Sequence, residues 1–207
     1  MTKDKQRNHL EARKTPTQSR SAETVNVILE AAARILEETG FEGYTTNAVA
    51  ERAGVSIGSL YQYFPGKDAL TVALIERETS VLLAEIAIAQ QAQSCAAGLD
   101  RVIHAAVAHQ MRRPTLARLL DFEERRLPID TRTGRVTDLI HAALLALFSL
   151  EDSPVLKHAD IVSYDVIAIV KGIVDAAGER AETDPQRLNL RVRRAVFGYL
   201  GASAGEP

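Results

Sequence analysis

The stretch of sequence that decides the fold spans residues 45–70 and reads TTNAVAERAGVSIGSLYQYFPGKDAL. Apolar residues recur at helical spacing over 46–53 and again over 57–64, and the tripeptide GVS at 54–56 separates the two runs. The glycine permits a sharp turn, and the threonine or serine that precedes each run is typical of a helix N-cap. Two short helices joined by such a turn predict a helix-turn-helix unit.

The second of these helices has an unusual exposed side. Leu60 and Phe64 lie four residues apart and point together into a small core, so the remaining side chains of the helix face solvent. No residue from Ser56 to Gly66 is charged, and Lys67 follows directly. An uncharged side of hydroxyls, rings and an amide next to a cation favours contact with a groove of DNA. The residues on this side are Ile57, Gly58, Ser59, Tyr61, Gln62 and Tyr63.

Helical periodicity continues on both sides of this unit. Residues Val25 to Leu36 form one apolar stripe, which Gly40 closes. Further stripes predict a helix from about Lys67 and others at 99–112, 115–125, 133–150, 156–180 and 185–200. The sequence therefore predicts an all-α fold of about nine helices, with a three-helix N-terminal DNA-binding domain and a helical C-terminal domain.

Three functional regions follow from this pattern. Residues 1–20 contain six cations and two acids with little apolar content, which predicts a flexible basic tail. Residues 21–67 form the predicted helix-turn-helix domain, and residues 68–207 form a predicted helical C-terminal domain.

Composition limits the classes of function. The 207 residues contain 25 Lys and Arg against 27 Asp and Glu, which gives a net charge of −2. A protein that coats nucleic acid without selectivity is strongly basic, so any DNA contact must come from a local surface. Cys95 is the single cysteine and the N-terminus is polar, and together these features predict a cytoplasmic protein. The apolar stretch at 139–150 is too short to span a membrane.

The segment Thr45–Leu70 resembles the DNA-binding signature of the TetR family of bacterial transcriptional regulators. The landmarks that carry the resemblance are Ala50, Ala53-Gly54-Val55, Leu60-Tyr61, Phe64, Lys67 and Leu70, and the preceding ILEAAARILEETGFEGY is similar to the family's first helix. The resemblance implies a dimer that binds a quasi-palindromic operator and that a small-molecule effector releases. It also implies that residues 68–207 are the effector-binding and dimerisation domain. It implies a repressor first, with an activator as the alternative.

The resemblance also implies roles for single residues. Thr45, Thr46 and Ser56 approach the phosphate backbone or the groove, and Asn47 lies at the mouth of the major groove, where many relatives carry a basic residue. Ile57, Gly58 and Tyr61 face bases; Ser59, Gln62 and Tyr63 lie near phosphates; and Lys67 anchors a phosphate. For Ile57, Tyr61 and Tyr63 the alternative is a purely structural or incidental position.

Two further expectations concern the C-terminal domain. The helices at 156–180 and 185–200 carry wide apolar stripes, which predict a homodimer interface or, alternatively, burial within one protomer. Four polar side chains interrupt apolar stripes: His109, Gln110, His141 and Asp165. Buried polar groups are costly without partners, so these side chains either form hydrogen bonds in the core or contact an effector.

Rival functions have weaker support in the sequence. It contains no phosphate-binding glycine loop, nucleophile elbow or zinc-protease motif, so we expect no enzyme, no cofactor and no metal. The alternative regulator is a redox sensor based on Cys95, although no neighbouring cation in the sequence favours its thiolate.

Overall fold

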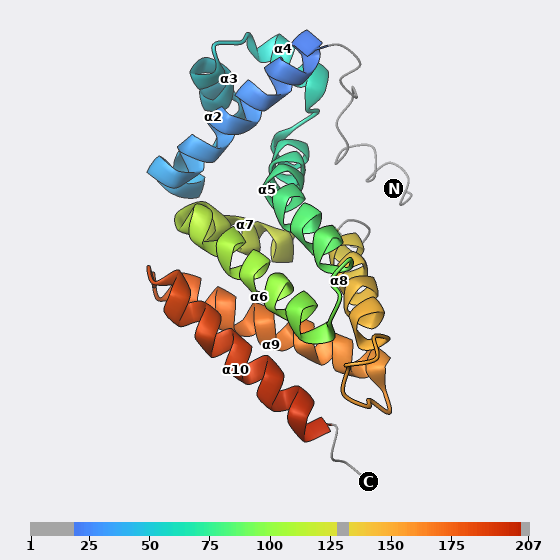
Figure 1. Cartoon of the computed structure of the whole chain (residues 1–207). Coiled ribbons are helices and arrows are strands. Elements are labelled where there is room, and N and C mark those ends of the chain that lie inside the picture. Colours follow the sequence, from blue (N-terminus) through green and yellow to red (C-terminus); the bar gives the residue numbers. More distant parts are fainter. Residues whose placement is uncertain (1–18, 128–132, 204–207) are drawn as a thin grey trace. The chain divides into compact units, whose positions relative to one another are not determined.

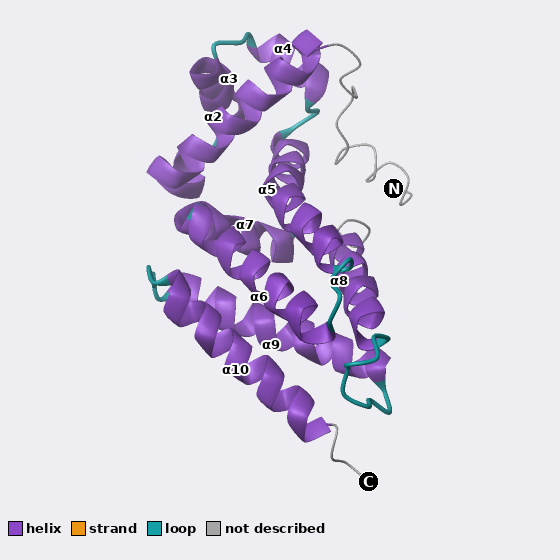
Figure 2. Cartoon of the chain, viewed as in Figure 1, coloured by secondary structure: helices purple, strands orange, loops and turns teal. Residues whose placement is uncertain are grey.

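The computed structural model describes residues 19–127 and 133–203, and in these ranges every regular element is a helix (Figure 2). The helices in chain order (Figure 1) are α2 (Ser19–Gly43), α3 (Thr46–Ala53), α4 (Ile57–Tyr63), α5 (Lys67–Ala89), α6 (Cys95–Arg112), α7 (Pro114–Arg126), α8 (Thr133–Phe148), α9 (Ala159–Glu179) and α10 (Pro185–Ser203). The predicted all-α fold is confirmed. Nearly all of the predicted basic tail lies outside the described residues.

Several predicted helix ends differ from the structure by a few residues, and local structure explains two of them. α6 begins four residues earlier than predicted, because the Ser94 side chain accepts from the backbone N–H of Ala97 and caps the helix there. Gly40 does adopt positive φ (63°), as expected of a residue that ends a helix, but one more turn follows it before α2 ends at Gly43.

The chain divides into two compact units. In the described ranges, the first unit contains residues 19–78 and 119–127, and the second contains 79–118 and 133–203. Both α5 and α7 therefore contribute residues to each unit.

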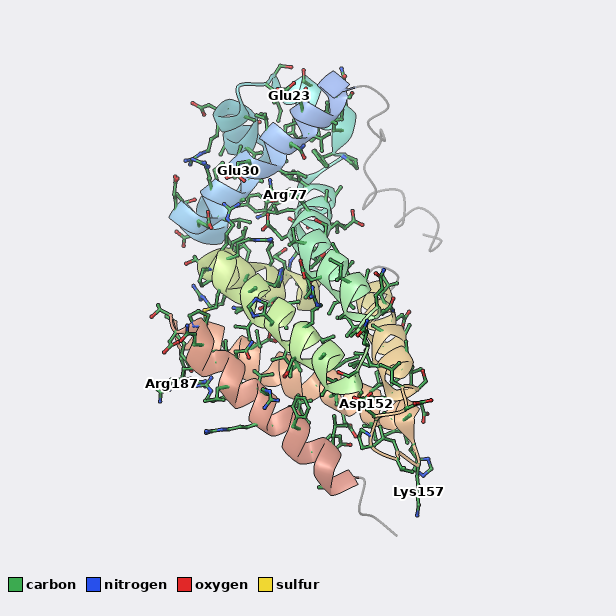
Figure 3. All side chains as sticks on the ribbon, in the orientation of Figure 1. Glu23, Glu30, Arg77, Asp152, Lys157 and Arg187 are labelled. Carbon is green, nitrogen blue, oxygen red and sulfur yellow. The ribbon has the colours of Figure 1, made fainter. Side chains whose placement is uncertain are left out.

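The first unit is built around α2. Its apolar stripe is buried together with Val49 of α3, Leu60 of α4 and Leu70 of α5. Arg77 of α5 also reaches Glu30 of α2, with 3.3 Å between Nη2 and Oε2 (Figure 3). The shared core holds the short helices α3 and α4 against α2, and the ion pair joins α5 to α2.

The second unit has its core between α6, α8, α9 and α10. Gly98 of α6 permits close packing on α8, because a Cβ at this position would stand 2.2 Å from Cδ2 of Leu147. The stripes that predicted a dimer interface, including Val166 on α9 and Val192 and Val196 on α10, are buried inside the protomer. No described helix combines the length and the hydropathy needed to cross a bilayer.

Candidate nucleic-acid interface

The turn between α3 and α4 is formed by local hydrogen bonds that the sequence predicts. Thr45 caps α3 by accepting from Ala48 N at 3.1 Å, and Ser56 caps α4 by accepting from Ser59 N at 3.0 Å. Gly54 adopts the left-handed conformation (φ 67°) and ends α3. The helix-turn-helix geometry thus follows from two caps and one glycine.

The outer face of α4, defined as Ile57, Gly58, Ser59, Tyr61, Gln62 and Tyr63, is available to a partner. Leu60 and Phe64 are fully buried on the opposite side of the helix, as expected. Ile57 is 37% exposed and Tyr61 is 41% exposed, although both side chains are apolar or aromatic. Gly58 and Gln62 are exposed, whereas Ser59 and Tyr63 are half-buried.

Two tyrosine hydroxyls of this face are bound to neighbouring helices. Tyr61 Oη shares a hydrogen bond with Thr46 Oγ1 of α3 at 3.2 Å, which joins two residues predicted to contact DNA. Tyr63 Oη shares one with Ser21 Oγ of α2 at 3.1 Å. The bond to α2 and the partial burial of Tyr63 favour the structural alternative for that residue, while Tyr61 retains an exposed ring.

The first turn of α3 adds a second surface for an anion. Thr45 and Asn47 are exposed and Thr46 is half-buried. The first turns of α3 and α4 contain no acidic residue. Unpaired backbone N–H groups and the helix dipole favour negative charge at such ends, so phosphates are suitable partners there.

Lys67, the first residue of α5, is fixed by a buried tyrosine. Its ammonium lies 4.9 Å from the centre of the Tyr44 ring, a cation–π contact. The Tyr44 hydroxyl shares a hydrogen bond with Thr71 Oγ1 at 3.1 Å, and Thr71 in turn donates to the carbonyl of Lys67. Burial raises the pKa of Tyr44, so the ring stays neutral. Tyr44 and Thr71 had no predicted role, although Tyr44 ends the quoted first-helix motif.

The four predicted effector residues do not come together in one site. His141 Nδ1 is 2.5 Å from Ser163 Oγ, and its ring stacks on Tyr164 with centroids 4.2 Å apart. Because Ser163 donates its proton to the carbonyl of Asp160, His141 is the donor in this pair. Asp165 accepts from the hydroxyl of Tyr199. His141 and Asp165 therefore have the partners that the core alternative requires.

Gln110 differs from these two residues. It is 3% exposed, and its Nε2 has no hydrogen-bond partner among the described residues. Its amide packs on Gly178, where an added Cβ would stand 2.1 Å from Nε2. Gly178 is fifteen residues along α9 from the Ser163 that binds His141, a separation of about 22 Å on a helix. His109 is half-buried beside Gln110 in the chain.

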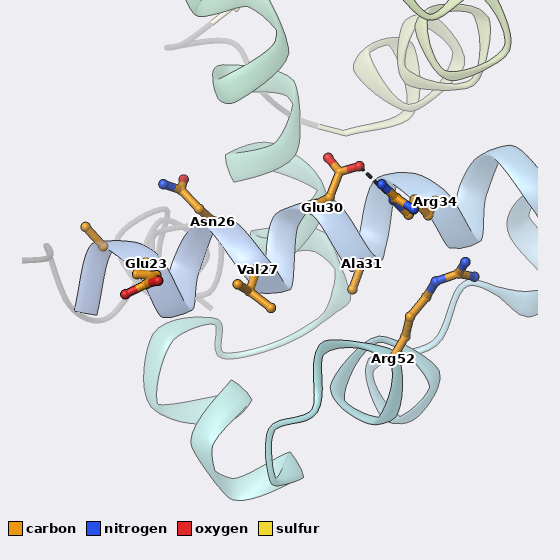
Figure 4. A pocket seen from close by; sticks show the side chains of 8 residues that line it. Glu23, Asn26, Val27, Glu30, Ala31, Arg34 and Arg52 are labelled. Carbon is orange, nitrogen blue, oxygen red and sulfur yellow. Dashed lines mark hydrogen bonds and ion pairs between the residues drawn. The ribbon is translucent and has the colours of Figure 1, made fainter. Parts of the chain in front are cut away.

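A surface hollow of about 760 Å³ lies on α2 and α3 (Figure 4). Its lining includes the apolar side chains of Val27 and Ala31 and the charged side chains of Glu30, Arg34 and Arg52. These charges are engaged within the protein, since Arg34 pairs with Glu30 and Arg52 pairs with Glu38. None of the predicted effector residues lines this hollow.

Cys95 lies in surroundings that oppose redox sensing. The residue is 2% exposed, and burial raises the pKa of its thiol. Its backbone N–H donates to both carboxylate oxygens of Asp152, at 2.8 and 2.9 Å, at the start of α6 (Figure 3). Oxidation requires an accessible thiolate, so the redox alternative is disfavoured.

Two protein-family models match this chain, one in its N-terminal part and one in its C-terminal part. The family model described as bacterial regulatory proteins, tetR family, matches residues 28–74. The model described as tetracyclin repressor-like, C-terminal domain, matches residues 94–200. The HTH-type transcriptional repressor KstR of Mycolicibacterium smegmatis is 47% identical over 51 residues, which is 25% of this chain and 25% of KstR. The match thus spans only a quarter of that repressor.

Solved structures share the fold over most of the chain. A TetR-family transcriptional regulator from Streptomyces coelicolor superposes with a TM-score of 0.66 and 23% identity, over 87% of this chain and 99% of that one. FadR of Bacillus subtilis, in complex with stearoyl-CoA, superposes with a TM-score of 0.71 and 15% identity, over 84% and 97%. At these identities the likeness concerns the fold alone.

Proposed function

The chain belongs to the TetR family of bacterial regulatory proteins and is a transcriptional regulator with a helix-turn-helix, and from this premise we propose that it is a repressor that binds a quasi-palindromic operator as a homodimer. The observation that carries the proposal is the exposed and uncharged outer face of α4, which lies between the capped start of α3 and Lys67. The relative KstR is described as a transcriptional repressor, which supports repression over activation in this proposal.

We assign DNA contacts to both short helices and to the start of α5. The proposed contacts are Thr45, Thr46, Asn47, Ser56, Ile57, Gly58, Ser59, Tyr61, Gln62 and Lys67. Tyr63 is left out of this set because its hydroxyl is bonded to Ser21 of α2. Side chains near bases select sequence, and those near phosphates give affinity and register. In this proposal residues 21–67 bind DNA, and residues 68–207 bind the effector and form the dimer.

The proposed dimer uses the exposed sides of α9 and α10. Ile161, Tyr164, Ala168 and Gly172 are exposed and lie along one side of α9, and Leu190 is exposed on α10. The small residues permit close approach of a second copy. Two half-sites about 34–36 Å apart would then be contacted in successive major grooves.

The proposed effector is a largely apolar small molecule bound in the C-terminal domain of this cytoplasmic regulator. The bound stearoyl-CoA of the FadR structure is an example of a ligand in a protein of the same fold. In this chain Gln110, whose Nε2 has no hydrogen-bond partner among the described residues, is the best-supported polar contact of the four that we proposed. A coupling of about 1–3 kcal/mol between effector and operator binding changes affinity roughly 5–150-fold.

Selection of genomic DNA fragments by the purified protein tests the function. We expect the selected fragments to be enriched in a quasi-palindromic sequence. Selection that enriches no such sequence would contradict the proposal. Lys67→Ala should weaken binding to the selected operator and to unrelated DNA alike. It should also reduce the slope of log affinity against log salt by about one for each protomer, because one phosphate contact is lost.

A further inference from the structure

Ion pairs link the first turn of α5 to the end of α7. Arg126 Nη2 donates to Asp68 Oδ1 at 2.6 Å and to Glu123 Oε2 at 2.7 Å. Arg126 Nε donates to both oxygens of Glu123 at 3.0 and 3.1 Å. The Glu123 side chain is 5% exposed, whereas the side chains of Arg126 and Asp68 are 45% and 48% exposed. Arg126 thus bridges a buried acid of α7 and an acid of α5, 58 positions away in the chain.

The same part of α7 packs on other residues of the DNA-binding unit. Residues 119–127 belong to the first compact unit, with α3 and α4. The Phe122 ring lies 5.6 Å from that of Phe41 in α2, centroid to centroid. Burial raises the pKa of Tyr44, and the negative charges of Glu123 and Asp68 raise it further. The same ring contacts the ammonium of Lys67.

Asp68 is well placed to orient the residue before it. The first turn of a helix lacks backbone acceptors for its N–H groups and frays most easily, so side-chain contacts there decide how it is held. Successive residues of a helix point in different directions. When Arg126 holds the Asp68 side chain, it therefore fixes the orientation of the first turn of α5 about the helix axis. The Lys67 side chain points in a different direction from that of Asp68 and stays separate from this ion pair.

We propose that Arg126 is a positioning residue for DNA binding, which holds Asp68 and so fixes the first turn of α5 with Lys67 directed to the operator backbone. This inference rests on the proposed function, in which Lys67 contacts a phosphate. It extends the DNA-binding machinery to α7, which lies outside the residues matched by the N-terminal family model.

Long-range electrostatics and positioning predict opposite results for Asp68→Asn. Loss of an acid near a polyanion should tighten binding if charge alone matters. Loss of the contact to Arg126 should weaken binding if positioning matters. The variant keeps the pair between Arg126 and Glu123, so the buried acid stays compensated and the fold is retained.

The experiment measures operator affinity and its salt dependence for Asp68→Asn, Arg126→Lys and their combination. Arg126→Lys keeps the charge and can compensate Glu123, but an ammonium lacks the planar fork that bridges two carboxylates. We expect each variant to bind about three- to tenfold more weakly and with a smaller salt slope, and the double variant to be no weaker than the single ones. Arg34→Lys is the matched control, because it alters an ion pair of α2 in the same unit.

The outcomes separate this inference from the proposed function. If Lys67→Ala leaves affinity and salt slope unchanged, the phosphate contact itself is wrong. If Lys67→Ala weakens binding but Asp68→Asn binds as tightly as the parent or more tightly, the positioning role of Arg126 is refuted. Equal losses in the Arg34→Lys control would also overturn it, as would strictly additive losses in the double variant.

Discussion

At the scale of single residues, the hydroxyl groups near the outer face of α4 are oriented by neighbours. Tyr61 is bound to Thr46, and Ser56 and Ser59 share a hydrogen bond of 2.8 Å between their hydroxyls. Groups that are fixed before binding lose less conformational entropy when a partner arrives. Their geometry therefore favours selective contacts over a flexible surface.

Tyr61→Phe tests the contribution of one such hydroxyl. The variant keeps the exposed ring and removes the bond to Thr46, so we expect operator affinity to fall by about two- to tenfold, the range for one neutral hydrogen bond. The salt slope should stay constant because no charge changes. Fluorescence anisotropy at several salt concentrations measures both quantities. A change in slope equal to that of Lys67→Ala would contradict this assignment.

At the scale of helices, local signals were sufficient for α3 and α4 but not for contacts between distant segments. Thr45, Gly54 and Ser56 determine three helix ends through bonds to residues within four positions, so the sequence alone predicted the unit. Arg126 reaches Asp68 across 58 positions, and no periodic pattern encodes such a pair.

Hydrophobic periodicity also did not identify what a buried side chain packs against. The stripes of α9 and α10 indicated that Val166 and Val192 are buried, but not against what. The structure places them inside the protomer, while the neighbouring side of α9 with Ile161 and Tyr164 stays exposed. A hydrophobic period identifies a buried side; the partner depends on tertiary packing.

Gly98→Ala tests the close packing of α6 on α8. The added methyl group would stand 2.2 Å from Leu147 Cδ2, so we expect a loss of about 1–3 kcal/mol in the free energy of unfolding. Chemical denaturation monitored by circular dichroism measures the loss. Combination with Leu147→Ala should cost less than the sum of the two single changes, since the smaller side chain makes room. Strict additivity would show that the two positions do not meet.

At the scale of the whole molecule, the proposed dimer depends on one exposed side of α9. A Cβ at Gly172 would meet no atom within 4 Å in the protomer. We therefore expect a substitution there to leave the fold of the protomer intact and to act only through a second copy packed on this side. Near a two-fold axis, identical charges would oppose each other.

Gly172→Glu should shift the dimer towards monomer and weaken operator binding in proportion. Sedimentation velocity measures the association, and the melting temperature shows whether the protomer is intact. Ala96→Glu, which places the same charge on the exposed start of α6, is the control that should stay dimeric. A dimer of unchanged stability in Gly172→Glu would exclude this side of α9 as the interface.

The buried Cys95 has a practical consequence for measuring how far apart two operator-binding surfaces lie. Since it is the sole thiol in the sequence and is shielded from solvent, maleimide dyes should leave the parent protein almost unlabelled. A cysteine introduced at an exposed site such as Gln62 would then carry the fluorophore alone. In the proposed dimer, energy transfer between two such dyes would report the distance between the two α4 helices, with and without candidate inducers.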